Sequence, residues 1–248
     1  MDGLATTTAA AAAPRTAWAA LLDAASRPYL GAGRFAYHFA RGKLGGDPAY
    51  RGILERGLLT ERARILDLGC GQGLLTAWLR AAQRLYDAGV WTPGWPAPPR
   101  PQSMAGLELM ESDVQRARRA LGENCGISQG DIRTAAFGSV DAVAILDVLH
   151  YMDRQAQREV LKKVRAALPA GGLLLLRIGD AASGMRFRYS EWVDKLVMLL
   201  RGHAWVKTHC RSVAQWQELL RECAFDVQAV PMSQGTPFAN VLLVAHAT

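Results

Sequence analysis

The feature that most constrains the fold is a short apolar run that leads into a turn with three glycines. Ile65, Leu66 and Leu68 make this run nearly continuous, as in a parallel strand that is buried on both faces. Glycines follow at positions 69, 71 and 73, and apolar residues then recur at helical spacing as far as residue 88. The stretch therefore predicts a strand, a tight turn and a helix, the unit from which doubly wound α/β sheets are built.

Asp67 places a carboxylate inside this buried strand, where a charge is unfavourable unless it has a partner. An acid at the carboxyl end of a central strand can hold cationic or hydroxyl groups of a ligand, and the glycines let the backbone approach that ligand closely. The dinucleotide fingerprint G-x-G-x-x-G requires a glycine at position 74, which is Leu74 here. This mismatch argues against a nicotinamide-dependent oxidoreductase, the rival enzyme class.

The pattern D-x-G-x-G-x-G resembles the first motif of class I S-adenosylmethionine-dependent methyltransferases, whose acid-and-glycine loop surrounds the methionine end of the cofactor. The resemblance implies that Asp67, Gly69, Cys70 and Gly71 line S-adenosylmethionine. A glycine-rich turn without any ligand is the alternative interpretation.

The second predicted strand, residues 104–110, carries Glu108 near its end. An acid at this point of a doubly wound sheet is placed to accept hydrogen bonds from both ribose hydroxyls of a nucleoside. By the resemblance, Leu109 beside it also contacts the cofactor. A surface glutamate is the alternative for Glu108.

The third predicted strand, near residues 125–128, is followed by Asp131 and Ile132. The resemblance implies that Asp131 meets the adenine amino group and that Ile132 packs on the ring. A Gly-Asp turn that merely caps a strand is the alternative.

The fourth predicted strand, residues 140–146, leads into Asp147, which the resemblance adds to the cofactor site. Enzymes of the family that methylate the exocyclic amine of a base usually show two prolines after this position. Val148 and Leu149 replace them here, which disfavours base N-methylation.

His150 follows the fourth strand beside the expected methyl group, and a histidine side chain can titrate near neutrality, so His150 is the candidate general base. Tyr151 is predicted to orient the substrate. A structural histidine is the alternative interpretation, and His38 and His209 are further candidates for the base.

Strands and helices alternate as far as a fifth strand at residues 173–177, and a helix and two more strands follow. This order resembles the methyltransferase sheet from residue 60 to the C-terminus. We therefore predict an α/β fold with a doubly wound, mostly parallel seven-stranded sheet, an N-terminal helical cap and a lid insertion after the fifth strand. The predicted parts are a disordered tail (1–14), the helical cap (15–59) and the S-adenosylmethionine-binding domain (60–248), which contains a Pro-rich loop (89–103) and the lid insertion (181–211).

Two kinds of local signal predict where elements begin. Ser112 with Gln115, and Ser212 with Gln215, have the spacing of capping boxes at helix starts. Residues 43–48 are rich in glycine and end in Asp-Pro, which predicts a turn.

Composition limits the remaining function classes. The net charge of +7 is spread without a dense basic run, so nucleic acid is an unlikely partner and an acidic partner is only weakly favoured. The four cysteines form no C-x-x-C pair, which predicts reduced thiols, a cytoplasmic location and no metal site. The longest apolar runs are far too short to span a bilayer.

A narrower resemblance rests on residues 35–44, Asp47-Pro48 and residues 235–240. These stretches resemble methyltransferases encoded with bacterial aryl-polyene pigment enzymes, which implies an aromatic head group or its carrier-bound thioester as substrate and a place in secondary metabolism.

The hypothesis is therefore methyl transfer from S-adenosylmethionine to an oxygen or carbon nucleophile of a small aromatic or acyl molecule. The alternatives are an accessory protein that binds the cofactor without turnover and an NAD-dependent oxidoreductase. The apolar stripe of the predicted lid could cover a substrate, touch a membrane surface or join two copies in a homodimer.

Overall fold

The computed structural model describes residues 16–179, 208–232 and 240–248. Its strands are β1 (Arg64–Leu68), β2 (Ser103–Glu108), β3 (Ile127–Gln129), β4 (Ala142–Leu146), β5 (Leu173–Gly179), β6 (Phe225–Pro231) and β7 (Asn240–Ala247). Its α-helices are α1 (Ala17–Ser26), α2 (Arg34–Gly46), α3 (Pro48–Glu55), α4 (Leu74–Asp87), α5 (Glu111–Leu121), α6 (Arg154–Ala167) and α8 (Val213–Glu222). Two short 3₁₀ helices are η1 (Arg27–Ala32) and η2 (Leu149–Tyr151).

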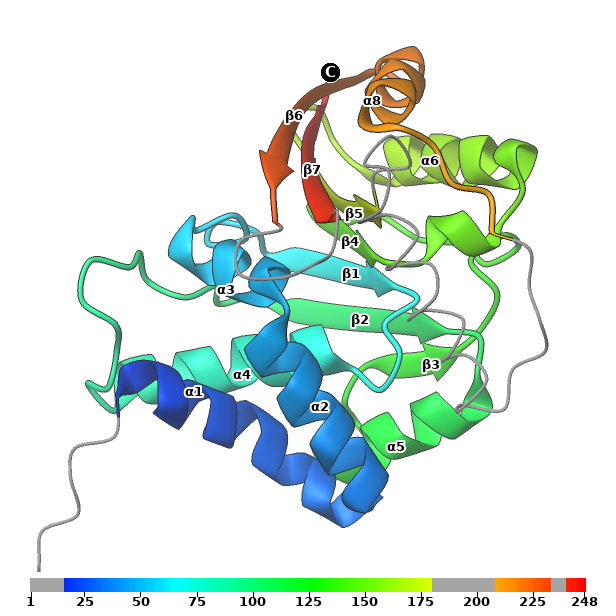
Figure 1. Ribbon diagram of the computed structural model, residues 1–248. Coiled ribbons are helices and arrows are strands. Elements are labelled where there is room, and N and C mark those ends of the chain that lie inside the picture. The colour runs from blue at the N-terminus through cyan, green and yellow to red at the C-terminus, as the bar shows by residue number, and fades with distance from the viewer. Residues whose placement is uncertain (1–15, 180–207, 233–239) are drawn as a thin grey trace, which may run out of the picture.

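The seven strands form one twisted sheet with the order β3-β2-β1-β4-β5-β7-β6 (Figure 1). The pairs from β3 to β5 are parallel, and β7 runs antiparallel to both β5 and β6. The predicted doubly wound, mostly parallel seven-stranded fold is confirmed.

Each central strand is apolar on both faces because helices cover both sides of the sheet. Ile65 of β1 and Ala142 of β4 pack into one cluster with α4 and the N-terminal helices. Their chain neighbours Leu66 and Val143 point the other way, into a second cluster with α6 and α8. Alternating side chains of one strand thus enter two different cores, which explains the unbroken apolar runs in the sequence.

The helices that precede β1 pack on the α4 side of the sheet. α1 contacts α4, and η1 contacts α5. The indole N–H of Trp78 in α4 donates to the backbone oxygen of Tyr50 in α3 at 2.9 Å. Lys43 Nζ near the end of α2 lies 2.9 Å from Asp147 Oδ2, just after β4, so the end of α2 reaches the edge of the sheet where β4 ends.

The predicted turn at residues 43–48 is wrong for most of its length, because α2 continues to Gly46. Gly45 lies so close to α1 that a Cβ there would be 3.1 Å from Cδ2 of Leu22. Gly45 therefore allows close packing of α2 on α1, and it does not end the helix. Between α2 and α3 there is a single residue, Asp47. Its carboxylate accepts the Ala49 N–H at 3.0 Å and caps α3.

One predicted capping box forms and the other does not. Ser212 and Gln215 exchange side-chain and backbone hydrogen bonds at the start of α8, as predicted. Ser112 instead lies inside the first turn of α5, which begins at Glu111. The N–H of Met110, just before this helix, donates to Glu108 Oε1 at 2.9 Å, so the end of β2 determines where α5 begins.

Several predicted segments lie outside the described residues: the tail at 1–14, most of the insertion at 181–211, and most of residues 235–240. Of the insertion, the structure describes only residues 208–211. In the described ranges, no helix combines the length and apolar character needed to cross a bilayer.

Candidate functional site

Glu108 and the glycine turn meet where β1 and β2 end side by side. Leu68 is paired with Leu107 in the parallel register, so the residues that follow both strands are neighbours. Gly71 N donates to Glu108 Oε2 at 2.8 Å, and Met110 N donates to Oε1 at 2.9 Å. Each carboxylate oxygen has further lone pairs, so this buried group is held rigidly and can still accept hydrogen bonds from a ligand.

The three glycines of the turn have positive φ angles and different surroundings. A Cβ at Gly69 would lie 2.4 Å from Cγ2 of Val148, and one at Gly73 would lie 2.4 Å from Cδ1 of Ile127. A Cβ at Gly71 would meet no atom of the described chain within 4 Å. Gly69 and Gly73 are therefore required for packing, whereas Gly71 borders open space beside Glu108.

Asp67 is only 3% exposed, at the buried end of β1. Across the described ranges, no group donates a hydrogen bond to its carboxylate. Burial, and secondarily the nearby Glu108, raise the pKa of Asp67 to about 7. A buried acid without a protein donor is unfavourable when it is ionised, and a cationic ligand would supply the missing partner.

Two helices that precede β1, η1 and α2, form hydrogen bonds with the glycine turn. Tyr29 Oη in η1 donates to the backbone oxygen of Gln72 at 2.8 Å, and Gln72 Nε2 donates to the backbone oxygen of Ala36 in α2 at 3.0 Å. Burial raises the pKa of Tyr29 far above its usual value, so its hydroxyl remains a donor. Sequence periodicity gives no sign of these contacts, because they join residues far apart in the chain.

The segments predicted to surround adenine lie next to one another. Gly130 N donates to the backbone oxygen of Glu108 at 2.9 Å, which brings the ends of β2 and β3 together. Leu109 is 56% exposed and Ile132 is buried. Asp131 accepts the Arg133 N–H at 2.9 Å and pairs with the Arg133 guanidinium, which lowers the pKa of Asp131. Its geometry is that of an Asx turn, the alternative considered from the sequence.

Asp147 follows β4 with a φ of +62°, which is uncommon for a residue other than glycine. Its Oδ2 lies 2.9 Å from Lys43 Nζ and also contacts Arg177 Nη1. Burial would raise the pKa of Asp147, but Arg177 and Lys43 lower it well below its usual value. Asp147 is therefore an anion already paired with cations of the protein.

His150 and Tyr151 lie in η2, and their ring centroids are 4.0 Å apart. The backbone oxygen of His150 accepts the His209 N–H at 2.7 Å. Gln157 of α6 is fully buried and donates to the backbone oxygens of His209 and Met152 at 2.8 and 3.0 Å. Residue 209 and α6 therefore hold this segment in place.

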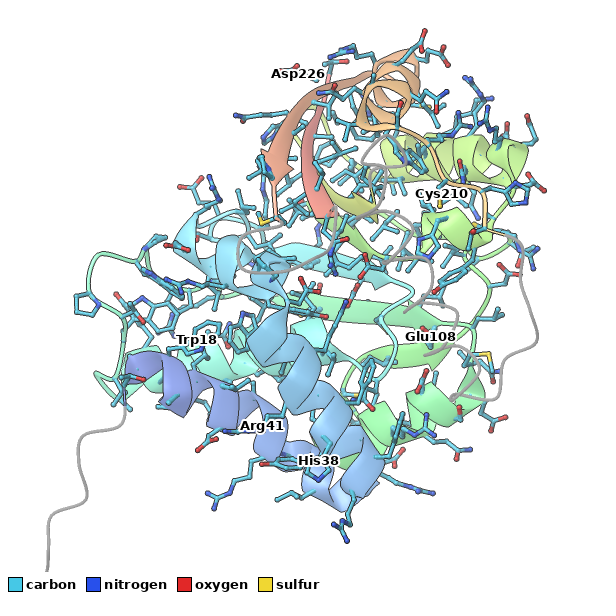
Figure 2. All side chains as sticks on the ribbon, viewed as in Figure 1. Trp18, His38, Arg41, Glu108, Cys210 and Asp226 are labelled. Carbon is cyan, nitrogen blue, oxygen red and sulfur yellow. The ribbon has the colours of Figure 1, made fainter. Side chains whose placement is uncertain are left out.

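The two other histidines considered from the sequence contribute differently. His209 contacts the η2 segment through its backbone, as described above. His38 is exposed on α2, and Figure 2 shows it well away from Glu108.

Reasoning from the sequence missed Lys43, Asp47 and Arg177, which surround Asp147. Arg177 could have been singled out from the sequence, because, like Asp67, it is a charged residue in an otherwise apolar strand. Lys43 and Asp47 had no such signal. Cys70 lies in the turn and is buried, which raises the pKa of its thiol. No cluster of three or more metal-ligating side chains occurs within the ranges that the structure describes.

Comparison with known proteins agrees with this geometry. Residues 66–174 match the family model described as a methyltransferase domain. The chain is 33% identical over 140 residues to a carboxy-S-adenosyl-L-methionine synthase of Chromohalobacter salexigens, a match covering 52% of this chain and 47% of that protein. It is 30% identical over 145 residues to a phenazine O-methyltransferase of Lysobacter antibioticus, covering 56% and 37%. The chain thus spans less than half the length of these curated relatives.

Solved structures share the fold at low sequence identity. The magnesium protoporphyrin IX methyltransferase of Synechocystis, solved with bound S-adenosylhomocysteine, superposes with a TM-score of 0.56 at 16% identity and covers 90% of this chain and 93% of its own. The mitomycin 7-O-methyltransferase gives 0.58 at 20% identity, covering 88% and 60%. Residues 66–174 thus match a methyltransferase domain, and the chain as a whole has the fold of these solved methyltransferases.

Proposed function

We propose that the chain binds S-adenosylmethionine at the carboxyl ends of β1 and β2 and transfers its methyl group to an oxygen or carbon of a small aromatic or acyl molecule. The observation that carries this proposal is that two buried acids, Asp67 and Glu108, stand at the ends of neighbouring strands in different surroundings. Glu108 is anchored by two backbone N–H groups, and Asp67 lacks any donor from the described chain. A ligand with hydroxyls at one end and an ammonium group at the other would satisfy both.

We assign residues of the chain to each part of the cofactor. Asp67 would accept the ammonium group of the methionine portion, which runs along Gly69, Cys70 and Gly71. Glu108 would accept the ribose hydroxyls. The adenine ring would lie among the side chains predicted for it, which are Leu109, Asp131 and Ile132.

When bound, S-adenosylmethionine supplies a methyl group that is already activated by the sulfonium. The protein then has to align the acceptor, exclude water and take up a proton where the acceptor carries one. Asp147 is a poor proton acceptor because Lys43 and Arg177 keep its pKa low. We therefore assign proton uptake to His150 and orientation of the acceptor to Tyr151.

The aromatic or acyl class of the acceptor rests on resemblance. One relative is named a phenazine O-methyltransferase, and a structure of the same fold is a mitomycin 7-O-methyltransferase. The stretches that resemble aryl-polyene-associated enzymes extend the proposal to a carrier-bound thioester. The diffuse positive charge does not favour nucleic acid as the acceptor.

Binding and turnover test different parts of the proposal. Calorimetry should show binding of S-adenosylmethionine and S-adenosylhomocysteine and no binding of NAD. Methyl-labelled S-adenosylmethionine should then label at least one member of a panel of phenols, hydroxylated aromatic acids and their acyl thioesters. Binding of neither cofactor would refute both enzyme hypotheses. Binding without transfer to any member of the panel would favour the accessory protein.

Gly71 offers a test that separates ligand binding from stability. The variant Gly71→Ala should lose most of its affinity for S-adenosylhomocysteine, because the added methyl group enters the open space beside Glu108. Gly89→Ala is the matched control, because Gly89 also has a positive φ and an added Cβ there would meet no atom within 4 Å. Both variants should lose about 1 kcal/mol of stability from the left-handed backbone, measured by chemical denaturation. Equal affinity in the two variants would contradict the placement of the ligand.

A further inference from the structure

Four charged side chains from separate parts of the sequence meet beside the proposed methyl-transfer site. Lys43 Nζ lies 2.8 Å from Asp47 Oδ2 and 2.9 Å from Asp147 Oδ2. Arg177 Nη1 contacts the same two oxygens. Each cation thus bridges both acids in a closed ring, which we call the charge ring (Lys43, Asp47, Asp147 and Arg177).

The charge ring is largely withdrawn from water and internally balanced. The side chains of Asp47 and Arg177 are each 5% exposed, and those of Lys43 and Asp147 are 31% and 30% exposed. Burial acts to lower the pKa of Lys43, but Asp147 and Asp47 raise it above its usual value. The ring joins two basic and two acidic side chains, and removing any one of them leaves an uncompensated charge.

Asp147 connects this ring to the segment that carries the candidate catalytic residues. Its backbone has a left-handed conformation, which is unfavourable for a residue with a side chain and needs support from the surrounding structure. The next residue, Val148, packs so closely on Gly69 that a Cβ at Gly69 would lie 2.4 Å from it. His150 and Tyr151 follow directly in η2. The position of Asp147 thus determines how this segment sits against the glycine turn.

We propose that Lys43, Asp47 and Arg177 are positioning residues that hold Asp147 in its left-handed conformation and thereby place residues 147–151 for methyl transfer. The catalytic part of this inference rests on the proposed function. The ring also makes α2 and α3 part of the site, although both helices precede the sheet in the chain. Lys43 and Asp47 act through Asp147, so their loss should affect turnover more than cofactor affinity.

Three variants of the full chain separate positioning from charge balance. Lys43→Met keeps the length and apolar stem of the side chain and leaves Arg177 facing two acids. Lys43→Met with Asp47→Asn restores the balance and keeps the Arg177–Asp147 pair, and asparagine can still cap α3. Lys43→Met with Asp147→Asn restores the same balance but removes the tether, while asparagine tolerates the left-handed backbone.

Hydrogen–deuterium exchange reports on residues 147–151 without requiring an acceptor. In Lys43→Met we expect the amides of this segment to exchange about tenfold faster. The double variant with Asp47→Asn should recover protection, and the one with Asp147→Asn should not. Equal recovery in both would overturn the proposal, because the ring would then act through charge balance alone. Unchanged exchange in Lys43→Met would also overturn it.

Kinetics and calorimetry complete the test. With the panel acceptor that turns over fastest, kcat of Lys43→Met should fall about 100-fold, since a small misplacement near the reacting groups has effects of that size. Its affinity for S-adenosylhomocysteine should change less than about threefold, because Lys43 pairs with Asp47 and Asp147 and not with Asp67 or Glu108, the acids assigned to the ligand. A loss of affinity equal to the loss of kcat would overturn the positioning role. If no acceptor turns over, the proposed function fails, and the exchange pattern still decides whether the ring tethers Asp147.

Discussion

Replacing Glu108 with alanine is expected to weaken the binding of S-adenosylhomocysteine about 100-fold, or by about 3 kcal/mol. The carboxylate would lose hydrogen bonds to two ribose hydroxyls, and hydrogen bonds to charged groups contribute about 1.5–3 kcal/mol each. The substitution also removes the acceptor of the Gly71 N–H, which lies 2.8 Å from Glu108 Oε2. Both effects act on the same ligand site, and calorimetry at constant pH measures their sum.

Glu111→Ala is the control for charge, because Glu111 lies three residues further on, at the exposed start of α5. Its removal changes the net charge equally and should leave affinity unchanged. Glu108→Gln should fall between the two variants, because the amide keeps one acceptor oxygen. If Glu108→Ala and Glu111→Ala bind S-adenosylhomocysteine equally well, the ribose assignment is wrong.

The second large effect is a dependence of ligand affinity on pH that originates at Asp67. On the proposed function, the ammonium group of the ligand would pair with the ionised carboxylate, whose pKa in the free protein is about 7. Affinity for S-adenosylhomocysteine should therefore rise about 25-fold between pH 5.5 and pH 7.5, as the fraction of ionised Asp67 increases. Asp67→Asn should bind weakly and show little pH dependence in the same calorimetric titration. A parent protein whose affinity does not vary over this interval would contradict the role of Asp67.

The stability of the free protein should change in the opposite direction. The unfolded carboxyl titrates near pH 4, whereas in the folded protein Asp67 titrates at about 7. Between these values the folded state binds more protons, so its stability falls as the pH rises. The contribution of protonated Asp67 is fully present below pH 4 and is lost as the pH passes about 7. The Tm of Asp67→Asn should exceed that of the parent by a margin that widens over this range and then levels off. A constant difference would indicate that burial of the charge is not its cause.

Local patterns in the sequence were sufficient for much of the fold. Unbroken apolar runs predict buried parallel strands because both faces of such a sheet are covered, and β1, β4 and β5 follow this rule. Ser212 and Gln215 predict the start of α8 because a capping box involves only neighbouring residues. The same approach failed at Ser112, where the carboxylate of Glu108 takes the N–H of Met110 and the helix begins earlier.

For the site, the sequence by itself determined the acids and glycines that stand at the ends of strands. Asp67 and Glu108 could be predicted because a charge in or after an apolar strand has few structural uses, and parallel strands bring their carboxyl ends to one edge. Their individual roles toward a ligand stay predictions. Only the tertiary structure decided that Arg177 reaches Asp47 across 130 positions of the chain and that Tyr29 donates to Gln72 across 43. Such contacts depend on how the N-terminal helices pack against the finished sheet, and hydrophobic periodicity records which face of a helix is buried but not which distant side chain it meets.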